Sequence, residues 1–257
     1  MPHFQIHQFN CLQDNFGVLV HNEDDGTTLA IDVPEAGPVL EALSAKGWTL
    51  SDILITHHHA DHVQGVAEVK EKTGARVYAP AQSATRIGSV DTAVQDGEAF
   101  QIGEISILPI ATPGHTLDQI SYYLPQANVA FTGDTLFALG CGRIFEGDAG
   151  MMWSSLERLV RELPSDTTIY CGHEYTLANA KFAVTVDPEN QALRARLQEI
   201  TQLRSADAPT LPTTMALELE TNPFLRPQDP AVQKALDMTG AAPQAVFAEI
   251  RRRKDNF

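Results

Sequence analysis

The sequence predicts an α+β fold in which a strand-rich domain is followed by a smaller helical domain. Short apolar runs, punctuated by Gly, Asp and Pro and alternating with helical patterns, fill the first two-thirds of the chain. After about Tyr175, apolar residues recur only at helical spacing. The chain has 257 residues, 43% of them hydrophobic, which is enough to form a buried hydrophobic core. We therefore expect a first domain at 1–174 and a helical second domain at 175–257.

The first domain begins with a predicted hairpin, because the apolar runs 16–20 and 27–33 flank the turn-forming sequence Asp-Asp-Gly at 24–26. A helix is expected at 38–46, where Gly47 suits a left-handed cap. Further strands are expected at 52–55, 76–79, 100–102, 105–111, 119–124, 129–132 and 168–171, and further helices at 63–72 and 151–163.

Three helices are expected in the second domain. The first rests on apolar residues three or four positions apart, the second on an N-cap followed by proline, and the third on an opening proline. The residues are Leu193, Leu197, Ile200 and Leu203 for the first, Asp229 and Pro230 for the second, and Pro243 for the third.

The composition excludes several classes of protein. No apolar run approaches the roughly 20 residues of a membrane helix, and the start Met-Pro-His-Phe lacks the features of a secretory signal, so we expect a cytoplasmic protein without a membrane contact. The formal net charge of -15 argues against a nucleic-acid partner. Cys11, Cys141 and Cys171 are too scattered for a disulfide framework or a Cys-rich zinc site. A metal site would therefore use His and carboxylate.

The sequence T-H-H-H-A-D-H at 56–62 directly follows the apolar strand predicted at 52–55. In an extended backbone, His57 and His59 project to the same side. Asp61 and His62 fall where the next helix begins and can serve a second centre. Neutral imidazole and carboxylate are ligands that zinc, iron and manganese accept. The spacing H-x-H-x-D-H thus offers two pairs of metal ligands.

Three more candidate ligands follow predicted strands in the same way. His115, Asp134 and His173 each lie beside a glycine, in the sequences T-P-G-H-T, T-G-D-T and C-G-H-E-Y. Glycine lets the backbone turn sharply and bring the side chain to a common rim. Ligands collected from several strand ends are typical of a site built on a rigid scaffold.

Other readings apply to single residues. His3, His7 and His21 are interpreted as ordinary structural histidines, and His58 as a residue that projects to the wrong side of the strand. For the cluster itself the alternative is a solvated polar turn, with Asp61 or His62 capping the helix.

With these residues assembled, the sequence resembles the metallo-β-lactamase superfamily, which shares H-x-H-x-D-H and later His, Asp and His ligands. The resemblance covers the first two-thirds of the chain and implies a four-layer αββα sandwich. It also implies the roles of seven ligands: His57, His59 and His115 on one metal, Asp61, His62 and His173 on the other, and Asp134 as the bridge.

Other segments are similar to glyoxalase II, the family of hydroxyacylglutathione hydrolases, and extend the match over nearly the whole chain. They are G-C-G-R-I-F-E-G at 140–147, G-H-E-Y-T at 172–176, N-P-F-L-R at 222–226 and R-R-R-K-D at 251–255. The resemblance implies that Arg143, Tyr175, Arg251 and Lys254 bind glutathione. Phe145 stands where the family often has tyrosine, so one hydroxyl contact is missing. Residues 251–254 could also be a basic last helical turn.

The resemblance implies hydrolysis of S-D-lactoylglutathione to glutathione and D-lactate, the second step of methylglyoxal detoxification. It assigns Asp61 and Asp134 to catalysis beside a metal-bridging hydroxide nucleophile. Two divalent ions per chain are expected, zinc first, with iron or manganese also suitable. The expected partner is a small glutathione thioester bound by a monomer.

Three alternatives stay open at the level of sequence. The first is a persulfide dioxygenase with one iron on the same fold. The second is another hydrolase, such as a β-lactamase or an RNA phosphodiesterase, which the acidic charge and the cytoplasmic start disfavour. The third is a metal-binding module without activity, which would need neither Tyr175 nor a basic tail.

Overall fold

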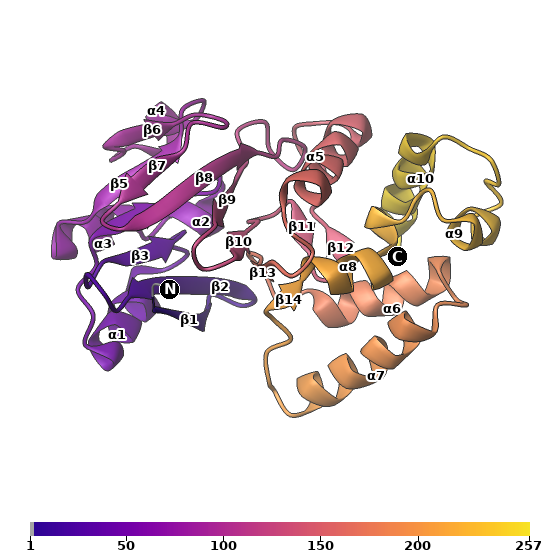
Figure 1. Cartoon of the computed structure of the whole chain (residues 1–257), viewed down its shortest axis with the longest axis horizontal. Coiled ribbons are helices and arrows are strands. Elements are labelled where there is room, and N and C mark those ends of the chain that lie inside the picture. The colour runs from indigo at the N-terminus through magenta and orange to yellow at the C-terminus, as the bar shows by residue number, and fades with distance from the viewer. Residues whose placement is uncertain (1–2) are drawn as a thin grey trace. The chain divides into compact units, whose positions relative to one another are not determined.

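The computed structural model describes residues 3–257 and divides them into two units (Figure 1). The first unit runs to Ala111 and includes the later segment Asp118–Gly133. The second unit consists of Thr112–Leu117 and Asp134–Phe257. In the part of the chain that the structure describes, no helix combines the length and the apolar character needed to cross a membrane.

A six-stranded sheet organises the first unit. Its strand order is β1-β2-β3-β4-β5-β6, antiparallel from β1 to β3 and parallel from β3 to β6. The strands are β1 (Phe4–Cys11), β2 (Asn15–Asn22), β3 (Thr28–Ile31), β4 (Asp52–Leu54), β5 (Arg76–Pro80) and β6 (Thr92–Val94). The hairpin expected around residues 24–26 is confirmed as β2 and β3. The edge strand β1 was not expected; most of its residues are only partly buried, and it pairs with β2 along its whole length.

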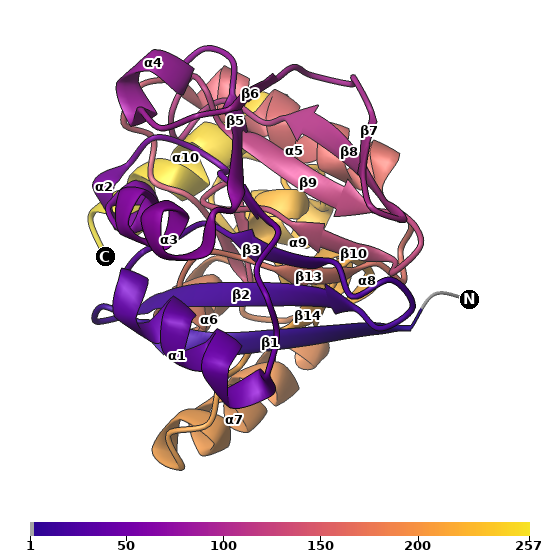
Figure 2. The same ribbon diagram turned by 90° about the vertical axis from the view of Figure 1, so that its left-hand side faces the viewer.

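Two helices cover one face of this sheet, α1 (Ala36–Lys46) and α3 (Val66–Thr73) (Figure 2). The expected left-handed cap of α1 is confirmed, since Gly47 has φ 68°. The helix expected at 63–72 corresponds to α3, which begins three residues later than expected because Gly65 separates it from the short helix α2 (Ala60–Val63). A Cβ at Gly65 would lie 2.6 Å from the backbone nitrogen of Ala36, so the chain needs glycine where α1 begins.

The first unit also contains the antiparallel strands β7 (Phe100–Ile102), β8 (Ile105–Ala111), β9 (Ile120–Leu124) and β10 (Val129–Phe131), and the short helix α4 (Ala84–Ile87). All four strands match the expected positions to within a residue at each end. Most of their apolar side chains are buried, and the hydroxyl of Tyr122 on β9 donates a hydrogen bond to the carbonyl oxygen of Ile55, 2.8 Å away. This bond links β9 to the segment just beyond β4.

The second unit is mainly helical, as expected for the C-terminal part of the chain. Its elements are β11 (Leu136–Phe137), β12 (Gly140–Cys141), α5 (Ala149–Glu162), β13 (Thr168–Tyr170), α6 (Thr176–Val186), α7 (Gln191–Ser205), β14 (Thr213–Thr214), α8 (Met215–Thr221), the 3-10 helix η1 (Pro223–Leu225), α9 (Pro230–Ala235) and α10 (Pro243–Asp255). The strands β11 and β12 form a two-residue antiparallel hairpin, and β13 pairs with β14. Trp153 of α5 and Phe247 of α10 pack with ring centroids 5.7 Å apart. The α+β class predicted from the sequence is confirmed.

Candidate metal centre

The first unit gathers the His-rich segment just beyond the end of β4. His57 and His62 are buried and their ring centroids lie 4.1 Å apart, while the centroids of His57 and His59 lie 4.8 Å apart. Nε2 of His62 lies 3.7 Å from Oδ2 of Asp61. The four candidate ligands of this segment therefore converge within the first unit. His59 serves as the N-cap residue of α2, which places Asp61 and His62 in the first turn of that helix.

Asp32 orients two of these imidazoles. Its Oδ2 accepts hydrogen bonds from Nδ1 of His62 and from the hydroxyl of Thr56, both at 2.8 Å, and its Oδ1 accepts from the backbone N–H of Thr56 at 2.7 Å. Because the Thr56 hydroxyl donates to Asp32, its oxygen accepts from Nδ1 of His57, 3.0 Å away. Both rings are thus held through Nδ1, which makes Nε2 the nitrogen that each would offer to a metal. Asp32 lies 30 residues from His62, so no local sequence pattern marks it for this role.

Asn15 and Asp118 hold the neighbouring residues. Nδ2 of Asn15 donates to the backbone carbonyl and to Oδ2 of Asp61, at 3.0 and 3.1 Å. Nδ1 of His58 lies 2.7 Å from Oδ1 of Asp118, and both side chains are buried. His58 therefore has a carboxylate partner 60 residues further along the chain, in keeping with its interpretation as a structural residue.

The second unit brings together the other three candidate ligands. Oδ2 of Asp134 lies 3.4 Å from Nε2 of His115 and 3.3 Å from Nε2 of His173. All three side chains are buried. Gly114 precedes His115 with φ 147°, and a Cβ there would lie 2.8 Å from Cα of Met152, so α5 approaches too closely for any larger residue. The glycine beside this ligand is therefore needed because the backbone of α5 packs directly against it.

The segment 142–147 wraps around His115. The carbonyl oxygen of Arg143 accepts a hydrogen bond from Nδ1 of His115 at 2.7 Å, and the backbone N–H of Phe145 donates to the carbonyl oxygen of His115 at 3.2 Å. A Cβ at Gly142 would lie 1.9 Å from the carbonyl oxygen of Asp134 and 3.4 Å from Cβ of His115. The segment that carries a predicted substrate residue is therefore packed directly against two candidate ligands.

Two of the predicted glutathione-binding residues are accessible beside these ligands. The side chain of Arg143 is exposed, with its guanidinium carbon 5.6 Å from the ring centroid of Phe145, which is 61% exposed. Tyr175 is 37% exposed and stacks on His173 with ring centroids 4.7 Å apart and an interplanar angle of 5°. Phe145 also contacts the ring of His115, edge-on at 5.3 Å between centroids.

The other two, Arg251 and Lys254, lie on α10. Arg251 is only 7% exposed and donates hydrogen bonds to Asp255 and to the carbonyl oxygen of Cys141. Lys254 has Nζ 5.4 Å from the ring centroid of Phe182. Burial, followed by the charge of Arg251, lowers the pKa of Lys254.

The three cysteines are buried and free. Burial raises the pKa of Cys141 to about 11, of Cys11 to about 12, and of Cys171 further still. Because a thiol is nucleophilic only as the thiolate, these side chains do not supply a nucleophile at neutral pH.

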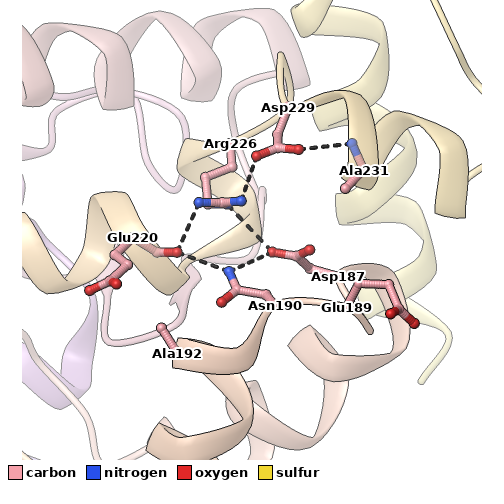
Figure 3. Close-up of a pocket in the computed structure, with 8 residues that line it drawn as sticks. All are labelled: Asp187, Glu189, Asn190, Ala192, Glu220, Arg226, Asp229 and Ala231. Carbon is pink, nitrogen blue, oxygen red and sulfur yellow. Dashed lines mark hydrogen bonds and ion pairs between the residues drawn. The ribbon is translucent and has the colours of Figure 1, made fainter.

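A pocket of about 400 Å³ opens elsewhere in the second unit (Figure 3). Arg226 occupies its centre, where it donates to the carbonyl oxygen of Glu220 at 2.9 Å and to Asp229 at 2.5 Å, and faces Asp187 at 3.4 Å. Nδ2 of Asn190 also donates to Asp187, at 2.8 Å. No predicted site residue is among the described residues that line this pocket. The arginine of the N-P-F-L-R sequence thus joins α8, the α6–α7 connection and α9.

Two family models match adjacent parts of the chain. Residues 23–173 match the metallo-beta-lactamase superfamily, and residues 174–257 match the hydroxyacylglutathione hydrolase C-terminus. A hydroxyacylglutathione hydrolase from Brucella anthropi is 51% identical over 100% of this chain and 98% of its own length. One from Mesorhizobium japonicum is 53% identical over 98% of this chain and 99% of its own length.

The fold has solved relatives as well. The crystal structure of BLEG-1 B3 metallo-beta-lactamase superposes with a TM-score of 0.67 at 22% identity, covering 86% of this chain and 100% of that one. Together with these groups of His and Asp side chains, membership of this superfamily indicates a dinuclear metal site. From the matches over both parts of its length, the chain belongs to the hydroxyacylglutathione hydrolase family of the metallo-β-lactamase superfamily.

Proposed function

We propose that this chain hydrolyses S-D-lactoylglutathione, an S-2-hydroxyacylglutathione, to glutathione and D-lactate, the second step of methylglyoxal detoxification. The observation that carries the proposal is the match of residues 174–257 to the hydroxyacylglutathione hydrolase C-terminus. A likeness confined to the metallo-β-lactamase part would leave many reactions open, because one fold hosts many functions. The relatives that match the whole chain at 51–53% identity are named for the same activity.

We propose the ligand scheme that the sequence analysis expects. One ion would be held by His57, His59 and His115, the other by Asp61, His62 and His173, with Asp134 as the bridge. Support comes from the orientation of the rings, since Nδ1 of His57, His62 and His115 is engaged by oxygen acceptors. The donor set of imidazoles and carboxylates fits zinc, our proposal for the resident metal, as well as iron or manganese.

Bound at this site, two divalent ions would supply a hydroxide nucleophile at neutral pH and a Lewis acid for the thioester carbonyl oxygen. The side chains of this chain would do the rest. Asp61 and Asp134 would hold the reacting centre, while the cationic Arg143 and Lys254 would neutralise the two carboxylates of glutathione. Tyr175, stacked on His173, would contact the substrate with its exposed face. The leaving thiolate has a conjugate acid of pKa near 8.5, so it departs without a general acid.

The domain roles remain part of this proposal. Residues 1–174 would form the catalytic domain and residues 175–257 the substrate-binding domain, a division supported by the boundary between the two family models. We also propose a cytoplasmic monomer whose partner is the small thioester, without nucleic acid or membrane. Light scattering on the purified protein tests the monomer.

The test of the activity is steady-state hydrolysis of S-D-lactoylglutathione by metal-replete protein, followed by loss of thioester absorbance. We expect a kcat/KM of about 10⁴ M⁻¹s⁻¹ or above. Removal of metal by a chelator should abolish turnover, and added zinc should restore it. Absence of turnover by protein that contains two ions per chain would contradict the proposal.

The comparisons give no better support to the alternative of a mononuclear iron persulfide dioxygenase. The same preparation separates the two, since a dioxygenase consumes oxygen in the presence of a persulfide and a thioester hydrolase does not. Metal stoichiometry gives an independent reading, one iron against two divalent ions per chain.

A further inference from the structure

We propose that Glu174 and Thr210 are positioning residues, which together fix the proposed metal ligand His173 and its neighbour Tyr175. Neither residue contacts the metal or the substrate in this role. The inference rests on the proposed hydrolase function and deepens it, because Glu174 is the first residue of the part that matches the hydroxyacylglutathione hydrolase C-terminus. It gives the C-terminal region a second task, which is to set the geometry of a ligand that precedes it in the chain.

One residue engages both carboxylate oxygens of Glu174. Its Oε2 accepts a hydrogen bond from the backbone N–H of Thr210 at 2.9 Å, and its Oε1 accepts from the hydroxyl of Thr210 at 2.7 Å. Both side chains are partly buried. Hydrogen bonds to a charged acceptor are stronger than those between neutral groups. These two bonds, named here the 174–210 pair, therefore hold the backbone directly after His173.

The segment 210–214 also holds the strand before this ligand. Strand β13 pairs with β14 in antiparallel register, with Ile169 opposite Thr213. Strand β13 ends three residues before His173, and the 174–210 pair begins one residue after it. A single segment of the C-terminal region thus fixes the chain on both sides of the ligand.

A buried ion pair anchors this segment in turn. The hydroxyl of Thr213 donates to Oε1 of Glu218 at 2.7 Å and accepts from Nη2 of Arg196 at 2.9 Å. The same Nη2 lies 2.6 Å from Oε1 of Glu218, and all three side chains are buried. Breaking such a pair leaves a buried charge without compensation, which is costly. Helices α7 and α8, which carry Arg196 and Glu218, therefore provide a rigid base for the 174–210 pair.

The residues on either side of Glu174 form the part of the site that this base positions. The rings of His173 and Tyr175 stack with centroids 4.7 Å apart, and Nε2 of His173 lies 3.3 Å from Oδ2 of Asp134. Loss of the 174–210 pair frees the backbone between the two rings, so both can move. A displacement of 1 Å at a catalytic centre can cost about 100-fold in rate. Such a loss should therefore weaken zinc binding and reduce kcat as well as raise KM.

A set of variants separates positioning from direct action of the carboxylate. Glu174→Ala removes the pair, and Thr210→Val removes its hydroxyl donor. Glu174→Gln keeps two hydrogen bonds, because the amide oxygen can accept from the N–H and the NH₂ group can donate to the hydroxyl oxygen. Thr210→Ser keeps both donors. Thr214→Val is the matched control on the same segment, where the hydroxyl caps α8 by accepting from the backbone N–H of Leu217.

Two of the three measurements need no turnover. Competition with a chromophoric chelator should show that one zinc dissociation constant rises about tenfold in Glu174→Ala. The amides of residues 171–175 should exchange with deuterium at least about tenfold faster in zinc-loaded Glu174→Ala without substrate. Its kcat/KM for S-D-lactoylglutathione should fall about 100-fold, with kcat contributing. Thr210→Val should change in the same direction by less, whereas Glu174→Gln, Thr210→Ser and Thr214→Val should stay near wild type in all three measurements.

Several results would overturn the positioning role. Equal losses in Glu174→Gln and Glu174→Ala would assign the effect to the charge itself, acting on metal or substrate. Unchanged zinc affinity and exchange in Glu174→Ala would also overturn it. Should Glu174→Ala not fold, Thr210→Val decides, and a variant that behaves like Thr214→Val contradicts the inference. A wild-type protein without thioester turnover contradicts only the proposed function, because zinc affinity and exchange still test the 174–210 pair.

Discussion

Replacement of Asp32 by asparagine should weaken zinc binding by the ligands of the first unit. Asp32 is buried and has φ 56°, a left-handed conformation that asparagine tolerates well. The substitution therefore changes the chemistry of the side chain with little backbone strain. It leaves all seven proposed metal ligands in the chain.

The size of the effect follows from the hydrogen bonds. Three donors converge on the two carboxylate oxygens of Asp32: the N–H and O–H of Thr56 and Nδ1–H of His62. An amide offers only one oxygen, so its NH₂ group must face at least one donor. The bond lost contributes about 1.5–3 kcal/mol, because its acceptor is charged. Loss of such a partner of a ligating histidine lowers metal affinity about 10- to 100-fold, which is about 1.4–2.8 kcal/mol. The two ranges agree.

The assay is competition for zinc with a chromophoric chelator. We expect the zinc dissociation constant of Asp32→Asn to rise about 10- to 100-fold. Asp52→Asn is the matched control, because Asp52 is also fully buried but lies on β4 and pairs with Arg76. An unchanged dissociation constant in Asp32→Asn, with a loss of thermal stability no different from the control, would refute the role of Asp32 in holding the imidazoles.

Glu218→Ala should lower Tm by about 10 °C in scanning calorimetry. The change leaves the buried Arg196 without its carboxylate partner, which costs about 3–5 kcal/mol of stability. A chain of this size loses about 2–4 °C of Tm per kcal/mol. The KM for the thioester should rise at alkaline pH. The pKa of Lys254 is lowered from its usual 10.5, so its ammonium group loses its charge as pH rises through that lowered value. Measuring KM from neutral pH upward checks this. Gly142→Ala should abolish turnover and reduce the metal content of the purified protein, because its Cβ would collide with the backbone of Asp134.

Each of these changes has a control. Glu220→Ala removes a carboxylate from the exposed side of the same helix, α8, and should leave stability within about 0.5 kcal/mol of wild type. Lys254→Arg keeps its charge at all relevant pH values, so the alkaline rise in KM should disappear; a rise that persists would assign it to another group. Gly37→Ala adds a methyl group where no atom lies within 4 Å, and normal metal content there confirms that the effect of Gly142→Ala is local.

The strands and helices were predictable wherever one residue pattern dominated. Strands β7 and β8 are rich in apolar residues and separated by a turn that contains Gly103, and both were expected with the bounds that the structure gives them. Strand β1 was missed because its stability comes from pairing with β2 along its whole length, while half of its own residues are polar. Helix α6 was missed because small residues, mainly alanine, give it little amphipathic contrast although much of it is buried.

The candidate ligands were predictable from local sequence, because a strand end followed by a short polar segment leaves a recognisable pattern. The residues that orient them were not, since their partners are remote in the chain. Asp32 lies 30 residues from His62, and Asn15 lies 46 residues from Asp61. Arg251 and Cys141 are 110 residues apart. Only the folded chain reveals such pairs.

Several backbone groups of the short hairpin β11–β12 form their hydrogen bonds with side chains from helical segments much later in the chain. Four of its backbone groups are served from there: the carbonyl oxygens of residues 137 and 140 by Asn222, the N–H of Leu139 by Glu218, and the carbonyl oxygen of Cys141 by Arg251. A change in the conformation of the hairpin must therefore remain compatible with these side chains of the C-terminal region. Chimaeras that join two family members at the 173–174 junction should work only when both parents carry compatible residues at these positions, so inheritance of the C-terminal region as an independent cassette is restricted.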